Sequence, residues 1–154
     1  MRALVVLLLA LASACAESTA VVVGEREAVV AVLAGRELDL EAPPEAVRDE
    51  GAAAVLVALA RDPGEHPRYV QHRAVALLRY HPRPEVYDAL LEFSASDDGG
   101  MREAALQSLG RAFVKRHARE LAALAGDRLA DPDDGVRRAA RELLVRARTA
   151  RFQD

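Results

Sequence analysis

The chain has 154 residues, enough for one domain, and hydrophobic residues make up 51% of it, so a packed core can form. Its formal net charge is −3, aromatic residues account for only 4%, and tryptophan is absent. This composition argues against a strongly basic protein and against aromatic platforms that stack on bases, so we expect no nucleic-acid partner.

The first sixteen residues have the pattern of a secretory signal peptide. Arg2 is followed by a short uncharged apolar run, and small residues then precede the acidic Glu17. The apolar run is too short to cross a bilayer as a stable helix. We therefore expect residues 1–16 to be a cleaved signal, residues 17–24 a short leader, and residues 25–154 the folded domain.

Cys15 is the only cysteine of the chain, and it lies at the expected cleavage point. A general signal peptidase would cut after Ala14 or Ala16. Alternatively, residues 11–15 (Leu-Ala-Ser-Ala-Cys) resemble a bacterial lipobox, with the leucine one residue further from the cysteine than usual, and Cys15 would be the lipidated mature N-terminus. We favour lipidation, because no second thiol is present for Cys15 to pair with. A lipid on Cys15 would be the chain's only attachment to a membrane.

Codon chemistry indicates the kind of organism. The chain contains no asparagine and no isoleucine, and Lys115 is its only lysine. All three residue types have AT-rich codons, so their scarcity indicates a GC-rich genome, which is typical of many bacteria. With the export signal, this predicts a periplasmic protein or a membrane-anchored lipoprotein.

Beyond the leader, apolar residues recur at helical spacing, and short polar turns rich in Gly, Pro and Asp separate the segments. Gly51 marks a break inside the second segment, because glycine is unfavourable in a helix interior. No segment alternates as a strand would, so we expect an all-α fold. The predicted helices span about residues 25–34, 43–61, 68–80, 84–94, 101–113, 118–125 and 136 onward.

Three of these helices contain similar segments with an arginine at a matching position. The arginines are Arg73, Arg102 and Arg137, separated by steps of 29 and 35 residues. A helical segment that recurs at this period predicts a helical solenoid, in which stacked neighbours bury a continuous core. Counting pairs from the N-terminus leaves three pairs and a seventh helix. This helix either caps the stack or continues the solenoid into another subunit, and capping is the simpler interpretation.

Residues 131–140 (Asp-Pro-Asp-Asp-Gly-Val-Arg-Arg-Ala-Ala), followed by Leu143 and Leu144, resemble a HEAT repeat of the short bacterial type also seen in phycobilisome lyases. Residues 101–110 are a second good match, and the segment from Asp62 to Leu77 is a loose third. The resemblance covers about residues 62–150. It implies an α–α superhelix of the HEAT or armadillo-like kind.

Family members mostly serve as protein-binding scaffolds, so the resemblance implies a non-catalytic protein with no cofactor and an unidentified protein partner. An enzyme-accessory or lyase-like role is the alternative. In such stacks the second helix of each pair lines the concave, partner-binding side. By that analogy the candidate contact residues lie on the fourth and sixth helices, and they are Tyr87, Asp88, Glu92, Arg116 and Arg119.

Other side chains with catalytic or metal-binding potential have simpler interpretations. His66, His72 and His81 lie close in sequence, but turns separate them, so we expect capping or solvated histidines and no metal site. Ser108 precedes His117 by nine residues, yet no third group is placed to activate a nucleophile, so we expect Ser108 to pack at a helix contact.

Charge is unevenly distributed along the chain. Residues 1–100 hold 9 Lys and Arg against 16 Asp and Glu, whereas residues 101–154 hold 12 against 8. The basic C-terminal part could bind an acidic partner or lipid headgroups. We favour the simpler interpretation, in which it is the solvated face of arginine-rich helices.

Overall fold

The computed structural model describes residues 25–150, and the predicted signal peptide, the leader and Cys15 lie outside the described residues. The described part of the chain is helical, without a strand, as the sequence predicts. None of its helices has the length and apolar character needed to cross a membrane. The helices are residues 25–34, the 3-10 turn η1 (Glu45–Val47), α2 (Ala52–Arg61), α3 (Arg68–Leu77), the 3-10 turn η2 (Leu78–Tyr80), α4 (Pro84–Phe93), α5 (Gly99–Ala112), α6 (Val114–Asp127) and α7 (Asp134–Ala150).

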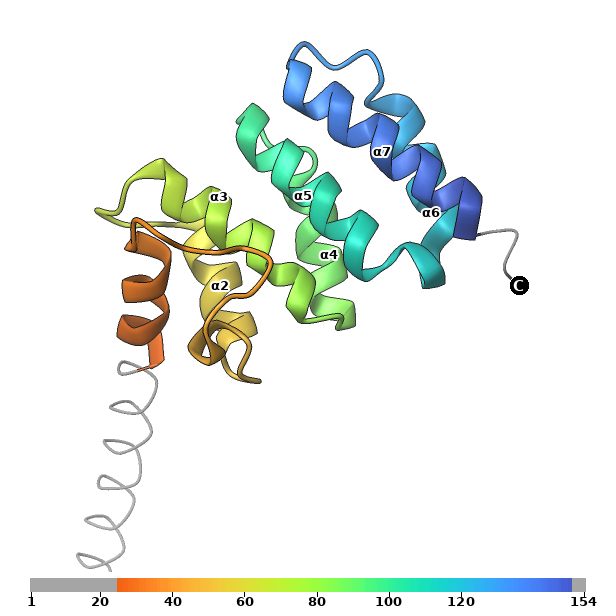
Figure 1. The fold of residues 1–154 in the computed structure, drawn as a ribbon. Helices are drawn as coiled ribbons and strands as arrows, with labels where there is room; N and C mark the ends of the chain where they lie inside the picture. The colour runs from red at the N-terminus through yellow and green to blue at the C-terminus, as the bar shows by residue number, and fades with distance from the viewer. Residues whose placement is uncertain (1–24, 151–154) are drawn as a thin grey trace, which may run out of the picture.

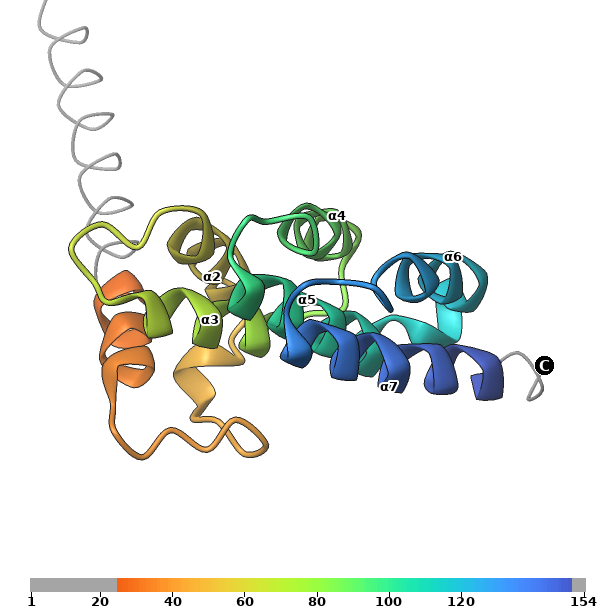
Figure 2. The ribbon, with the colours of Figure 1, turned by 90° about the horizontal axis from the view of Figure 1, so that it is seen from above.

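The helices form two layers. Helices α2, α4 and α6 lie in one layer and α3, α5 and α7 in the other, and the chain alternates between them (Figure 2). Helix α2 packs on α3, α4 on α5 and α6 on α7, so each pair contributes one helix to each layer. Successive pairs are stacked side by side along the molecule (Figure 1), which is the architecture of a solenoid.

The two layers are spaced differently. Helix α5 packs closely against both α3 and α7, and the cleft between α5 and α7 measures only about 80 Å³. In the other layer, grooves of about 600 Å³ and 320 Å³ separate α2 from α4 and α4 from α6. A stack curves toward the layer whose helices are closer, so we call α3, α5 and α7 the inner layer and α2, α4 and α6 the outer layer.

This arrangement corrects the predicted pairing. The extra helix is the one at residues 25–34, at the N-terminal end, and α7 is the second member of the pair α6–α7, not a lone cap. Helices α4 and α6 are therefore the first helices of their pairs and lie in the outer layer. Apolar stripes show that a helix is buried, but they do not show which of its two sequence neighbours is its partner.

Local sequence accounts for most helix boundaries. The Asp98 carboxylate accepts a hydrogen bond from the Met101 amide and caps α5, while Asp133 accepts from the Gly135 and Val136 amides and caps α7. Helix α4 begins at Pro84, where the missing N–H costs nothing. The predicted break at Gly51 is confirmed, since α2 starts one residue later.

Two predicted boundaries differ from the structure. Helix α6 includes a short turn from Val114 that the prediction lacks, and a kink at His117, whose φ of −125° and ψ of 28° are not helical, separates this turn from the part that starts at the predicted Ala118. The pair Gly99 and Gly100 starts α5 instead of belonging to the preceding turn. A side chain at Gly100 would come within 2.6 Å of the His72 ring, so close packing against α3 favours glycine there.

One hydrophobic core runs through the stack, and it is built from leucine, valine and many small alanines on the facing sides of the helices. All five residues predicted to pack on α7 are buried, namely Val136, Ala139, Ala140, Leu143 and Ala147. Alanines at these contacts allow the helices to approach closely, and leucines are the largest of the fully buried side chains.

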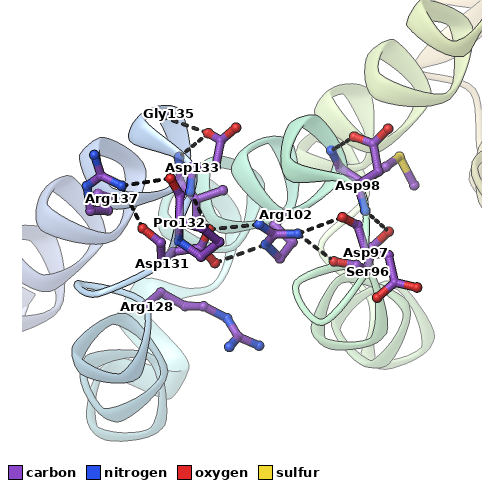
Figure 3. A network of polar contacts seen from close by, with 12 residues as sticks. Ser96, Asp97, Asp98, Arg102, Arg128, Asp131, Pro132, Asp133, Gly135 and Arg137 are labelled. Carbon is purple, nitrogen blue, oxygen red and sulfur yellow. Dashed lines mark hydrogen bonds and ion pairs between the residues drawn. The ribbon is translucent and has the colours of Figure 1, made fainter.

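The recurring arginines hold the turns between helices. Arg102 donates through Nη1 to the carbonyl groups of Ser96 and Asp97, and Arg137 donates to those of Asp131 and Pro132, so each reaches back six and five residues (Figure 3). The repeat of this contact explains why the sequence repeats the arginine.

In the first repeat the arginine has different partners. Arg73 donates to the carbonyl groups of Leu33 and Gly35, at 2.7 and 2.6 Å, and thereby holds the segment that follows the first helix. This segment, residues 35–44, crosses the side of α3 that faces away from α2 (Figure 2), and we call it the strap. Its far end is held by Tyr80, whose hydroxyl donates to the carbonyl groups of Leu40 and Glu41.

Candidate functional site

A pocket of about 320 Å³ opens in the outer layer between α4 and α6, and we call it the α4–α6 pocket. Apolar surface from aromatic rings and prolines makes up most of its wall, and charged side chains stand at its rim. Its volume suits one large apolar side chain or a small group of them. The lining residues are Pro82, Arg83, Pro84, Tyr87, Asp88, Phe113, Arg116 and His117.

Tyr87 organises the wall of this pocket. Its side chain is buried, and its ring stacks on the His117 ring with 4.0 Å between centroids and 19° between planes. The Phe113 ring lies 5.2 Å away at a tilt of 52°. The Tyr87 hydroxyl donates to Glu120 Oε2 at 2.9 Å, and His117 Nδ1 lies 3.2 Å from the same oxygen. These contacts fix the ring in one orientation.

The electrostatics of this cluster follow from its contacts. Burial raises the pKa of the Tyr87 hydroxyl, and the hydrogen bond to the nearby Glu120 carboxylate raises it further, so the hydroxyl stays protonated and acts as a donor. The hydrogen bond from Tyr87 lowers the pKa of Glu120, and His117 adds to that effect. Glu120 is therefore a carboxylate at neutral pH and acts as the acceptor for both rings.

Three of the five predicted contact residues meet at this pocket. Asp88 and Arg116 are exposed at its rim, and Tyr87 lies in its wall. Arg119 is exposed on α6 but does not line the pocket. Glu92 lies at the other end of α4, where it accepts from Arg61 at 2.6 Å, and this bond lowers the pKa of Glu92.

All five residues lie in the outer layer, because α4 and α6 belong to it. Pairing the helices from the N-terminus predicts these residues in the concave layer, and the structure corrects that pairing. Their role as partner contacts stays a prediction, now attached to the outer surface.

A second and larger groove, of about 880 Å³, runs along the edge where the turns of the first two pairs meet. Glu92 and Arg61 face each other there, and Asp98 accepts a hydrogen bond from Met101 and contacts His72 Nε2 at 3.0 Å. Burial opposes ionisation of Asp98, but the Met101 amide and the His72 ring outweigh it, so its pKa is lowered. In this groove Arg61 is paired with Glu92, and Arg68 and His72 contact Asp98, which leaves the groove less suited to a ligand than the α4–α6 pocket.

The histidines and the serine considered in the sequence have separate surroundings. His72 contacts Asp98, whereas the buried His81 places Nε2 2.9 Å from the Val47 carbonyl oxygen. Ser108 is buried and donates to the Val75 carbonyl at 2.9 Å across the contact between α5 and α3. Within residues 25–150 no group of three or more His, Cys, Asp or Glu side chains is arranged to hold a metal ion.

Sequence reasoning missed the roles of His117 and Glu120. The helical pattern placed His117 before the start of the sixth helix, and the kink that turns its ring onto Tyr87 has no local signature. One signal was present, because Glu120 follows Tyr87 by 33 residues, close to the repeat period, and residues one period apart lie side by side in a solenoid.

Comparison with known proteins supports the architecture. No curated protein and no solved structure matches this sequence significantly. Residues 53–145, more than half of the chain, match the family described as HEAT repeats, and this span runs from α2 into α7. The chain therefore belongs to the HEAT repeat family.

Proposed function

We propose that this protein is a non-catalytic scaffold that binds a partner protein through the α4–α6 pocket. HEAT repeats commonly mediate protein–protein interaction, and the fold is generally a non-catalytic scaffold. The observation that carries the proposal is the open, mostly apolar pocket whose wall holds Tyr87 and whose rim holds Asp88 and Arg116. Tyrosine and arginine are the residue types most often found at binding hot spots.

Binding would use an apolar side chain of the partner as an anchor. That side chain would pack against Tyr87, Phe113 and Pro84, while Arg116 and Asp88 would pair with charges around it. Tyr87 is already fixed by Glu120 and by stacking on His117, so the wall would lose little conformational entropy on binding.

We further propose that the scaffold acts in a bacterial cell envelope. The apolar N-terminal segment with its small residues before Glu17 supports export, and the position of Cys15 supports a lipid anchor. Mass spectrometry of the membrane-extracted protein tests the anchor, and we expect a mature N-terminus at Cys15 with acyl chains. An unacylated mature N-terminus would contradict the anchor and leave a soluble exported protein.

The binding proposal is tested by capture of partners from the native envelope with affinity-tagged full-length protein. We expect one partner to be retained by the wild type and by Tyr87→Phe, which keeps the ring. The double variant Tyr87→Ala with Arg116→Gln should lose it. Arg148→Gln on α7, an exposed arginine away from the pocket, is the matched control.

Circular dichroism of each variant establishes that the fold is intact, so that a lost partner reports on the surface. Retention of the partner by the correctly folded double variant would rule out the α4–α6 pocket as the binding site. Separate variants Glu92→Gln and Arg119→Gln test whether the contact extends over the outer layer beyond the pocket.

A further inference from the structure

The strap shows how the inner layer of this protein holds an acidic segment. The strap contains Glu37, Asp39 and Glu41, which alternate with half-buried Leu38 and Leu40. Side chains from α3 and η2 donate to its backbone carbonyl groups, as Arg73 and Tyr80 do at its two ends. The inner face therefore recognises both the backbone and the charge of a chain that runs across it.

The carboxylate of Glu41 reaches a second repeat. It lies 2.5 Å from Arg111 Nη1 on α5 and 3.2 Å from Arg79 Nη2 on η2. The hydrogen bond from Arg111 lowers the pKa of Glu41, so the carboxylate is charged at neutral pH. Arg111 is thus a carboxylate-binding position of the inner layer.

The repeat places a second arginine at the same position. Arg111 follows the anchor Arg102 by nine residues, and Arg146 follows the anchor Arg137 by nine residues. The two positions are therefore equivalent on α5 and α7. Both arginines line the cleft of about 80 Å³ between these helices, together with Gln107, Gly110 and Glu142.

Arg111 and Arg146 differ in their partners. Arg111 is paired with Glu41 of the strap, whereas Arg146 is exposed and forms no ion pair among residues 25–150. Arg138, earlier on the same helix, is paired with Glu103 at 2.6 Å. The strap reaches only as far as Arg111 on α5. Arg146, the equivalent arginine on α7, is therefore open to a carboxylate from another chain.

We propose that the inner layer binds an acidic segment of a partner protein across α5 and α7, with one carboxylate on Arg146 beside the Glu41–Arg111 pair. Helices α5 and α7 together hold seven arginines against three acidic residues, which makes these two helices complementary to such a segment. This inference rests on the proposed scaffold function and adds a second surface and the chemistry of the partner.

The test uses the full-length chain and a fluorescein-labelled peptide with the strap's own sequence over residues 37–42, Glu-Leu-Asp-Leu-Glu-Ala. A matched peptide carries Gln, Asn and Gln in place of the acids. We expect fluorescence anisotropy at low salt to show binding of the acidic peptide only. Loss of one charge-assisted contact in Arg146→Gln should weaken it about tenfold.

Arg148→Gln is the matched control, because it removes the same charge from the same helix about 200° around its axis. It should leave the affinity for the peptide nearly unchanged. Equal weakening by both variants would mean unspecific attraction to a basic helix and would overturn the proposal. Wild-type affinity in Arg146→Gln would also overturn it, since the peptide would then have displaced the strap from α3.

No binding of the acidic peptide, or equal binding of the uncharged one, would likewise refute the inner-layer site. These failures are distinct from failure of the scaffold proposal, which is judged by capture of an envelope partner with variants of Tyr87 and Arg116. A partner that is lost with those variants but retained by Arg146→Gln would leave the scaffold standing without the inner-layer site.

Discussion

Arg102 on α5 donates two hydrogen bonds to the carboxylate of Asp131 in the next repeat, from Nε at 3.0 Å and from Nη2 at 2.7 Å (Figure 3). Only 12% of the Arg102 side chain and 6% of the Asp131 side chain are exposed. The same guanidinium also donates to the carbonyl groups of Ser96 and Asp97. One arginine therefore closes its own turn and fixes the turn of the following repeat.

Replacing this arginine should destabilise the stack strongly. Arg102→Ala leaves the buried Asp131 carboxylate and two carbonyl groups without their donor, and we expect a loss of about 3 kcal/mol in the free energy of unfolding measured in urea. Arg138→Ala breaks the more exposed pair with Glu103 and serves as the control, with an expected loss of at most about 1 kcal/mol. Equal losses would mean that the Arg102–Asp131 pair does not couple the repeats.

The same pair makes stability depend on acid. The hydrogen bond from Arg102 lowers the pKa of Asp131 below its value in the unfolded chain, so the folded state binds this proton less readily. The stabilisation is complete above the ordinary aspartate pKa of about 4 and is lost as the pH falls through the lower folded value. Urea unfolding at pH 6 and at pH 3 should show a larger loss for the wild type than for Asp131→Asn.

Other lowered carboxylate pKa values, such as those of Asp98 and Glu92, contribute to acid sensitivity in both proteins. The difference between wild type and Asp131→Asn therefore isolates this pair. Parallel pH dependences of the two proteins would show that Asp131 is not linked to folding.

Two helical glycines should respond oppositely to alanine. A Cβ at Gly110 would lie 3.1 Å from Leu143 Cδ1 in the tight contact between α5 and α7, so Gly110→Ala should destabilise by about 1 kcal/mol or more through overpacking. A Cβ at Gly126 on α6 would meet nothing within 4 Å, so Gly126→Ala should stabilise by up to about 1 kcal/mol through helix propensity. Thermal unfolding followed by circular dichroism compares the two variants. Stabilisation by both substitutions would contradict the tight contact between α5 and α7 at Gly110.

Ser108 should behave as a packing residue that is also a hydrogen-bond donor. Ser108→Ala removes the bond to the Val75 carbonyl and should cost about 1 kcal/mol in urea unfolding. Ser108→Val should cost more, because it adds volume at a fully buried contact between α5 and α3. An unchanged free energy of unfolding in both variants would contradict the close contact of these helices.

The fold class could be read from local features of the chain. Helical spacing of apolar residues and the Asp-rich turns before α5 and α7 predict helices, because each depends on residues within one or two turns of one another. The 35-residue spacing of Arg102 and Arg137 predicts that these helices stack as repeats. Capping by Asp98 and Asp133 is local for the same reason.

The candidate site was only partly predictable. The analogy with HEAT-like stacks predicts five contact residues on the fourth and sixth helices. Tyr87, Asp88 and Arg116 meet at one pocket, but Glu92 and Arg119 do not join them. The pocket depends on a kink at His117 and on the contact between Tyr87 and Glu120, which are 33 residues apart. No local pattern encodes either feature.

The sequence by itself determined that the described chain is an all-α repeat protein, because periodicity, turn chemistry and capping act over a few residues. The tertiary structure decided which helices form pairs, which layer is concave, and that the strap crosses α3 to reach Arg111. An apolar stripe shows that a helix face is buried, but it does not show which helix covers it. The pairing of the helices and the path of the strap therefore depend on how all the faces pack together. The nine-residue spacing that makes Arg111 and Arg146 equivalent is visible in the sequence. Only the contact between Glu41 and Arg111 shows that this repeat position binds a carboxylate.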